Sequence, residues 1–165
     1  MNELDTATAA QVEALAAACK ARGLMLATAE SCTGGLIAAA CTSLAGSSDW
    51  FERGFVTYSN AAKTELLGVD PALIEAQGAV SAEVACAMTE GALRRSRAGV
   101  AVAVTGIAGP GGARPGKPVG TVWLAIGTRG ETAQARLLQP DGDRAAVRRQ
   151  TVTQALDASI AAARA

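Results

Sequence analysis

Apolar residues recur every three to four positions in several stretches of the chain, a pattern typical of helices with one buried face. In the first stretch Val12, Leu15 and Cys19 fall on one side, and Gly23 follows as a natural helix end. Asn60 precedes another such stretch and is a plausible N-cap for it. The pattern predicts helices over residues 8–22, 36–44, 60–67, 71–77, 81–96 and 144–163.

Short apolar or alternating segments between these helices predict strands. Residues 99–105 (GVAVAVT) are typical of a strand covered on both faces. The expected strands are 24–29, 50–59 (or a loop followed by a strand), 99–105, and a hairpin formed by 119–127 and 132–138. Because helices and strands alternate early and the hairpin comes late, we expect one α/β domain over residues 1–165. It should have three layers, with a mixed, mostly parallel sheet between helical layers.

Composition narrows the class of protein. Half of the 165 residues are apolar, which is enough for a sizeable core, and 15 basic residues balance 15 acidic ones. This balance argues against a partner that is nucleic acid or an anionic membrane, because both require a basic surplus. No apolar run reaches the roughly 18 residues of a membrane span, and the first residues lack a targeting pattern, so we expect a cytoplasmic protein.

The aromatic residues are concentrated: four of the five lie in residues 50–59. They could form one wall of a pocket, a contact between subunits, or ordinary strand packing. Together with the alanine-rich helices, this concentration favours a homodimer or larger homo-oligomer.

The chain contains no histidine, which excludes Ser-His-Asp and Cys-His catalytic arrangements. A hydrolase with this sequence needs another base. The four cysteines have no metal-binding spacing, and no carboxylate cluster has one, so neither a metal nor another cofactor is expected. We expect the cysteines to be buried and reduced.

The segment ESCTGG follows the strand predicted over residues 24–29. A serine at this point, Ser31, would expose its hydroxyl at the sheet edge, and the backbone N–H groups around Thr33, Gly34 and Gly35 could stabilise an oxyanion. Two alternatives stay open. Ser31 could be an N-cap in a tight turn, or Cys32 could be the nucleophile, with only a helix N-terminus to stabilise its thiolate.

A second candidate segment runs from Tyr58, the only tyrosine, to Lys63, one of three lysines. A buried lysine can stay neutral and accept a proton, so Ser-Lys and Ser-Tyr-Lys arrangements are a route to an activated serine without histidine. The alternative for Lys63 is a solvated position on an amphipathic helix.

A glycine-rich loop follows the strand that ends at Thr105, and it could form a backbone nest for a phosphate or carboxylate. The loop matches neither a P-loop nor a dinucleotide motif, so ATP and dinucleotides are disfavoured. Near the start of the last helix, Arg144, Arg148 and Arg149 offer guanidinium groups suited to a phosphate, or form a solvated basic face.

Taken together, ESCTGG, FVTYSNAAK, VAVTGIAGPGG and GDRAAVRRQ closely resemble the CinA C-terminal domain family, in the family's order and over nearly the whole chain. These are the nicotinamide mononucleotide deamidases, or nicotinamide-nucleotide amidohydrolases. The resemblance implies hydrolysis of the carboxamide of nicotinamide mononucleotide to nicotinate mononucleotide and ammonia, in pyridine-nucleotide salvage.

The resemblance also implies roles for single residues. Ser31 would be the acyl-forming nucleophile, and Tyr58 and Lys63 would activate it and shuttle its proton to the leaving ammonia. The remaining implied positions, all substrate-binding, are Glu30, Asn60, Thr105, Gly106, Arg144 and Arg148, of which the two arginines would hold the phosphate.

Two other functions remain open at this point. One is a non-catalytic module that binds a nucleotide or a protein partner, and the other is an amidase for a different amide.

Overall fold

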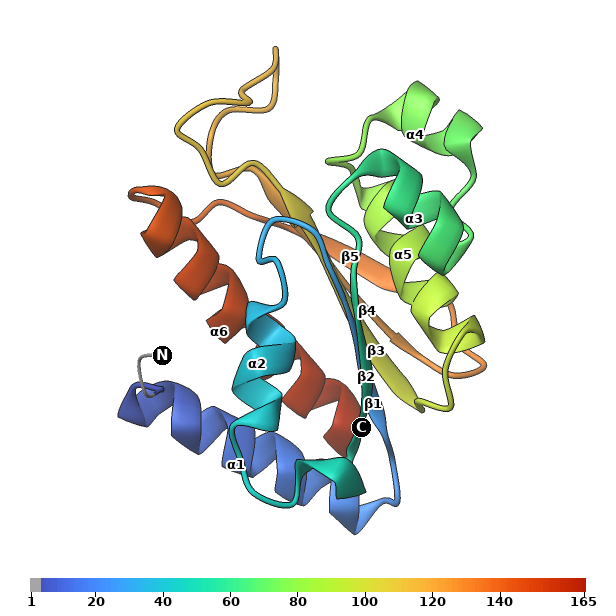
Figure 1. Ribbon diagram of the computed structural model, residues 1–165, viewed down its shortest axis with the longest axis vertical. Coiled ribbons are helices and arrows are strands. Elements are labelled where there is room, and N and C mark those ends of the chain that lie inside the picture. The colour runs from blue at the N-terminus through green and yellow to red at the C-terminus, as the bar shows by residue number, and fades with distance from the viewer. Residues whose placement is uncertain (1–3) are drawn as a thin grey trace.

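A computed structural model describes residues 4–165, and its centre is one five-stranded sheet (Figure 1). The strands are β1 (Leu26–Glu30), β2 (Phe51–Val56), β3 (Val100–Gly106), β4 (Val122–Thr128) and β5 (Gln134–Leu138), in the spatial order β2-β1-β3-β4-β5. Strand β1 pairs in parallel with both β2 and β3, whereas β4 is antiparallel to β3 and to β5. The sheet is therefore mixed, with a parallel centre.

Helices cover both faces of this sheet (Figure 1). On one side lie α1 (Thr6–Ala21), α2 (Leu36–Thr42) and α6 (Arg144–Arg164), and on the other α3 (Asn60–Leu67), α4 (Pro71–Gln77) and α5 (Ala82–Arg94). A short 3-10 turn, Ser47–Asp49, leads into β2. The predicted three-layer α/β fold is confirmed.

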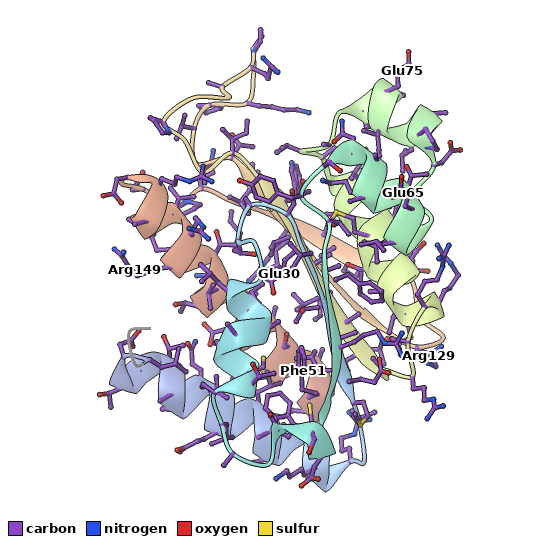
Figure 2. The ribbon with its side chains drawn as sticks, in the orientation of Figure 1. Glu30, Phe51, Glu65, Glu75, Arg129 and Arg149 are labelled. Atoms are coloured by element: carbon purple, nitrogen blue, oxygen red, sulfur yellow. The ribbon has the colours of Figure 1, made fainter. Side chains whose placement is uncertain are left out.

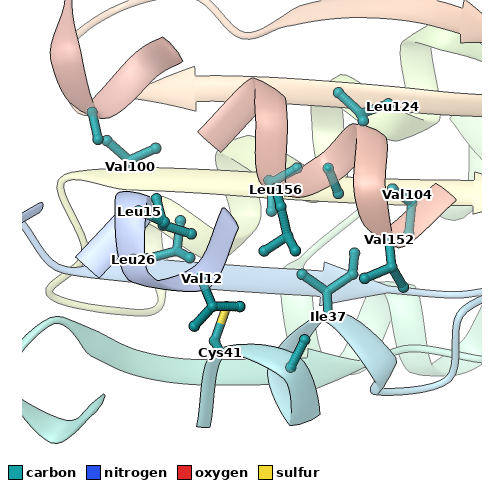
Figure 3. Packing of buried hydrophobic residues seen from close by; sticks show 14 of the residues in the cluster. Val12, Leu15, Leu26, Ile37, Cys41, Val100, Val104, Leu124, Val152 and Leu156 are labelled. Atoms are coloured by element: carbon teal, nitrogen blue, oxygen red, sulfur yellow. The ribbon is translucent and has the colours of Figure 1, made fainter. Parts of the chain in front are cut away.

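The central strand β3 shows how the sequence builds the two layers. Its valines Val100, Val102 and Val104 face the core beneath α1, α2 and α6, where they join Leu15 and Leu156 (Figure 3). Its alternate alanines pack in the other core, under α5. Successive side chains of a strand point to opposite faces. The larger valines therefore fill the core beneath α1, α2 and α6, and the small alanines let α5 pack close to the sheet.

Several predicted boundaries differ from the structure. The N-cap of α3 is Ser59, whose hydroxyl accepts from the N–H of Ala62, so the prediction of Asn60 as the cap is wrong by one residue. The strand expected over residues 50–59 ends at Val56, and the one expected from residue 119 begins at Val122. A turn closed by the Thr121 N–H and the Pro118 carbonyl occupies the intervening residues of the second strand.

The aromatic residues divide rather than forming one surface. Trp50 is fully buried and its ring meets that of Phe51 edge-on at 6.3 Å, which is ordinary core packing. Tyr58 is exposed on the loop after β2. No helix within residues 4–165 has both the length and the apolar character needed to cross a bilayer.

Candidate active site

The direction of the connections reverses at the carboxyl end of β1. The chain leaves β1 to form β2 on one side of it, and later returns to form β3 on its other side. The connection through α2 lies on one face of the sheet and the connection through α3, α4 and α5 on the opposite face (Figure 1). In open α/β sheets, ligands bind outside the carboxyl ends of the strands at such a reversal. Ser31 is the first residue after β1 and therefore lies at this position.

Ser31 and Lys63 meet there, although 32 residues separate them in the chain. The Ser31 N–H donates to the Val104 carbonyl, which extends the β1–β3 ladder and fixes the serine backbone. The Lys63 Nζ lies 3.3 Å from the Ser31 Oγ and donates to the Thr57 carbonyl at 2.9 Å. Lys63 comes from α3, so the site joins both helical layers across the sheet edge.

The environment of Lys63 favours its neutral form. Its side chain is 1% exposed, and Ser31 is 9% exposed. Burial lowers the pKa of Lys63, because the charged ammonium is poorly solvated at this position. A neutral amine beside a serine hydroxyl can accept the serine's proton.

Glu30 has a structural role that the sequence did not predict. Its carboxylate is 1% exposed, and it accepts hydrogen bonds from the Thr33 hydroxyl at 2.6 Å and from the N–H groups of Gly35, Ile37 and Ala38 at 2.8 to 3.1 Å. Figure 2 shows Glu30 at the start of α2. These bonds satisfy N–H groups that the first turn of a helix leaves unpaired. These bonds give Glu30 a role in holding the turn, and its binding of substrate stays a prediction.

The hydrogen bonds within this turn determine which backbone N–H groups are free to stabilise an oxyanion. The Gly34 N–H donates to the Ser31 carbonyl and the Gly35 N–H to Glu30, so neither of these predicted oxyanion donors is available. In residues 4–165, the N–H groups of Cys32 and Thr33 have no hydrogen-bond acceptor. Of the three residues expected to supply donors, Thr33 keeps a free N–H, and Cys32, whose thiol alone was a candidate, has a free N–H as well.

The Cys32 thiol is a poor nucleophile in this position. Its side chain is buried, and burial, the largest effect, raises its pKa to about 11. The nearby charge of Glu30 adds to this rise. At neutral pH the thiol therefore stays protonated, whereas nucleophilic attack needs the thiolate.

Arginines from the start of α6 line a cleft next to the turn after Ser31. Arg144 and Arg148 border a cleft of about 660 Å³, together with Ala108, Pro110, Val119 and residues 142–145. Arg148 donates to the Thr33 carbonyl at 3.1 Å, which links this cleft to the turn after Ser31. A cleft of this volume suits a small molecule, and two guanidinium groups suit an anionic part of it.

Tyr58 contacts Arg144 of this cleft and makes no hydrogen bond to the serine. Its side chain is 59% exposed, and its hydroxyl accepts a hydrogen bond from Arg144 at 2.9 Å. Among residues 4–165, Lys63 and Ser31 make no hydrogen bond to it.

The other predicted positions are spread around the site. The Thr105 hydroxyl is buried and donates to the Ala79 carbonyl, so it is already used. At Gly106 an added Cβ would fall 2.9 Å from the Thr121 carbonyl oxygen, so this glycine permits the close approach of the chain entering β4. Asn60 is exposed and borders a different cleft, between α3 and α4.

Two backbone groups of the site were not predicted from the sequence. They are the carbonyls of Thr57 and Gly109, which accept hydrogen bonds from Lys63 and Arg144, respectively. Backbone acceptors carry no signal in residue type, so the sequence could not have indicated them. No group of three or more His, Cys, Asp or Glu side chains within the described residues is arranged to hold a metal ion.

Comparison with known proteins identifies the family of this chain. The model of the CinA C-terminal domain matches residues 8–162. The chain belongs to the CinA C-terminal domain family.

Relatives and solved structures of this family resemble the chain over most of their length. The nicotinamide-nucleotide amidohydrolase PncC of Pseudomonas putida is 61% identical over 130 residues, 79% of this chain and 81% of that protein. The protein of the same name from Escherichia coli K12 is 53% identical over 145 residues, 87% of each chain. A crystal structure of competence/damage inducible protein CihA from Agrobacterium tumefaciens is 46% identical, with a TM-score of 0.93 over 98% of both chains.

The bonds to Glu30 predict a large stability cost when its carboxylate is removed. Glu30→Ala leaves the Thr33 hydroxyl and three N–H groups without an acceptor. We expect it to lower the free energy of unfolding by about 3 kcal/mol, measured by urea denaturation. Glu30→Gln, which keeps one acceptor oxygen, should cost less.

The matched control is Glu13→Ala, at an exposed position of α1, which should change stability by no more than about 0.5 kcal/mol. Equal stability of the Glu30→Ala and Glu13→Ala variants would show that the carboxylate does not hold the turn.

Proposed function

We propose that this chain hydrolyses the carboxamide of nicotinamide mononucleotide to nicotinate mononucleotide and ammonia. The observation that carries the proposal is the contact of 3.3 Å between Ser31 and a buried lysine. Relatives that are 51 to 61% identical and bear the name nicotinamide-nucleotide amidohydrolase support the substrate.

In the proposed reaction Ser31 is the nucleophile and Lys63 the base. Neutral Lys63 takes the proton of the Ser31 hydroxyl as Oγ attacks the amide carbon. The Thr57 carbonyl, which accepts from Lys63 at 2.9 Å, keeps the Nζ directed at Ser31 while its charge changes. The resulting ammonium then gives its proton to the amide nitrogen, so that ammonia leaves and an ester on Ser31 remains.

The oxyanion of the tetrahedral intermediate needs donors close to Oγ. We assign this role to the N–H groups of Cys32 and Thr33, since those of Gly34 and Gly35 are already bonded. A donor of this kind contributes about 3 kcal/mol to transition-state stabilisation. Lys63, neutral again after ammonia leaves, then deprotonates the water that hydrolyses the ester.

Arg144 and Arg148 would hold the phosphate of the nucleotide in the cleft of about 660 Å³. Because this phosphate is dianionic near neutral pH, a forked guanidinium binds it better than it binds a neutral acceptor. Tyr58 would assist proton transfer, as the family resemblance implies. The binding roles implied for Asn60, Thr105 and Gly106 remain predictions.

The test of this function is to incubate the purified chain with nicotinamide mononucleotide, without added metal, and to quantify ammonia and nicotinate mononucleotide. We expect both products in equal amounts. Ser31→Ala should lower the rate about a thousandfold or more, because it removes the attacking atom. Ser48→Ala, an exposed serine without a side-chain hydrogen bond among the described residues, should keep full activity.

Full turnover by a folded Ser31→Ala variant would show that Ser31 is not the nucleophile. Absence of products from the folded unaltered chain would favour a binding module or an amidase for another amide, and a panel of amides with and without phosphate would separate these two.

The burial of Lys63 predicts how the rate depends on pH. Since its pKa is lowered, the neutral, basic form becomes populated at a lower pH than for an exposed lysine. We expect kcat/KM to rise with pH through this lowered pKa and then level off. Lys63→Arg stays protonated at all accessible pH values and should abolish the rise together with the activity.

Lys20→Arg, on the exposed side of α1, is the matched control and should leave the profile unchanged. A rising limb that persists in the Lys63→Arg variant would show that another group is the base.

A further inference from the structure

Arg144 ties together three segments that lie far apart in the sequence. It is the first residue of α6, and its Nη2 donates to the Tyr58 hydroxyl, on the loop between β2 and α3, at 2.9 Å. Its Nη1 donates to the Gly109 carbonyl, on the loop after β3, also at 2.9 Å. Both arms of the guanidinium are therefore engaged at the mouth of the cleft.

This arrangement conflicts with the two roles that the proposed function requires. Arg144 must turn toward a phosphate in the cleft, and Tyr58 must reach a serine–lysine pair that is almost fully buried, while its own side chain is 59% exposed. Tyr58 is nonetheless close by through its backbone. The carbonyl of its neighbour Thr57 accepts from Lys63, so the backbone that carries Tyr58 lies beside the lysine.

A phosphate is the stronger partner for Arg144. A phosphate adds opposite charge and can take both arms of the guanidinium in a bidentate pair, whereas the phenol and the peptide carbonyl are neutral acceptors. The cleft also offers Arg148 and the positive N-terminal end of α6, a helix of 21 residues. Asp143, the N-cap of α6, is the acidic residue lining this cleft, and its carboxylate is bonded to the Ala146 N–H.

We propose that Arg144 is a phosphate-operated latch on Tyr58. In the ligand-free protein it holds the tyrosine at the surface, and an anion in the cleft draws the guanidinium away and releases the side chain toward Ser31 and Lys63. The proposal rests on the proposed function for its catalytic consequence. Under it, the phosphate of the substrate contributes to kcat as well as to KM, and the enzyme discriminates against amides that lack a phosphate.

The single tyrosine makes the latch directly observable. Fluorotyrosine incorporated in place of tyrosine gives one fluorine NMR signal, which reports the surroundings of Tyr58 without any turnover. In a Ser31→Ala background, which blocks acylation, we expect the signal to shift on titration with inorganic phosphate and with nicotinamide mononucleotide. It should stay unmoved by chloride at the same ionic strength.

Substitutions of two arginines on α6 provide the comparison. Arg144→Ala and Arg144→Gln should each abolish the response to phosphate. Arg149, also considered for the phosphate from the sequence, is exposed on α6 and is not among the residues that line the cleft (Figure 2 labels it). Arg149→Ala removes the same charge and should leave the response intact. A signal that does not move with phosphate, or that moves equally in the Arg144 variants, overturns the latch.

A kinetic measurement gives the second readout. Added inorganic phosphate should accelerate cleavage of nicotinamide riboside, which lacks the phosphate, by about tenfold, since it releases Tyr58 in place of the missing group. The acceleration should vanish in the Arg144→Ala variant and persist in Arg149→Ala.

The two readouts separate the latch from the function. Movement of the tyrosine signal without any amide hydrolysis supports the latch and contradicts the proposed function. Hydrolysis of nicotinamide mononucleotide without movement of the signal supports the function and overturns the latch.

Discussion

The buried carboxylate of Glu30 is the constraint on which the site depends. It gathers the Thr33 hydroxyl and the first N–H groups of α2 onto one anion at the end of β1. A strand followed at once by a helix leaves N–H groups that need acceptors, and here a single side chain supplies them. With the turn held in this way, Ser31 faces Lys63, and the N–H groups of Cys32 and Thr33 remain free beside it. The chemistry proposed above uses the groups that Glu30 leaves unbonded.

The sheet brings the second half of the site to this turn. Because β1 lies between β2 and β3 and runs parallel to both, the segments that follow all three strands emerge at one edge. Thr57 and Lys63 come from the segment after β2, and Gly109 from the segment after β3. The last helix, α6, packs under the same sheet and begins at that edge with Arg144. Four stretches of chain thus meet at this edge of the sheet.

The sequence predicted the fold well, because periodicity reports burial directly. The helical pattern located the six α-helices that residues 4–165 contain, and the β-branched run at residues 99–105 identified the central strand. The site was only partly predictable. Local spacing left Lys63 as an exposed helix residue or a base, since its burial depends on α3 packing beside the end of β1. The role of Glu30 was missed because the N–H and O–H groups that donate to its carboxylate come together only in the folded turn. The Arg144–Tyr58 bond joins residues 86 apart, which no local pattern can indicate.

The central claim is that an ester on Ser31 lies on the path from amide to acid. Rapid quenching of the chain during turnover of nicotinamide mononucleotide, followed by mass spectrometry of its peptides, tests that claim most directly. The account predicts an adduct of the substrate less ammonia, located by fragmentation on Ser31 and stable to neutral hydroxylamine, as an oxygen ester is. An adduct on Cys32 that neutral hydroxylamine removes, as it removes a thioester, would contradict the account.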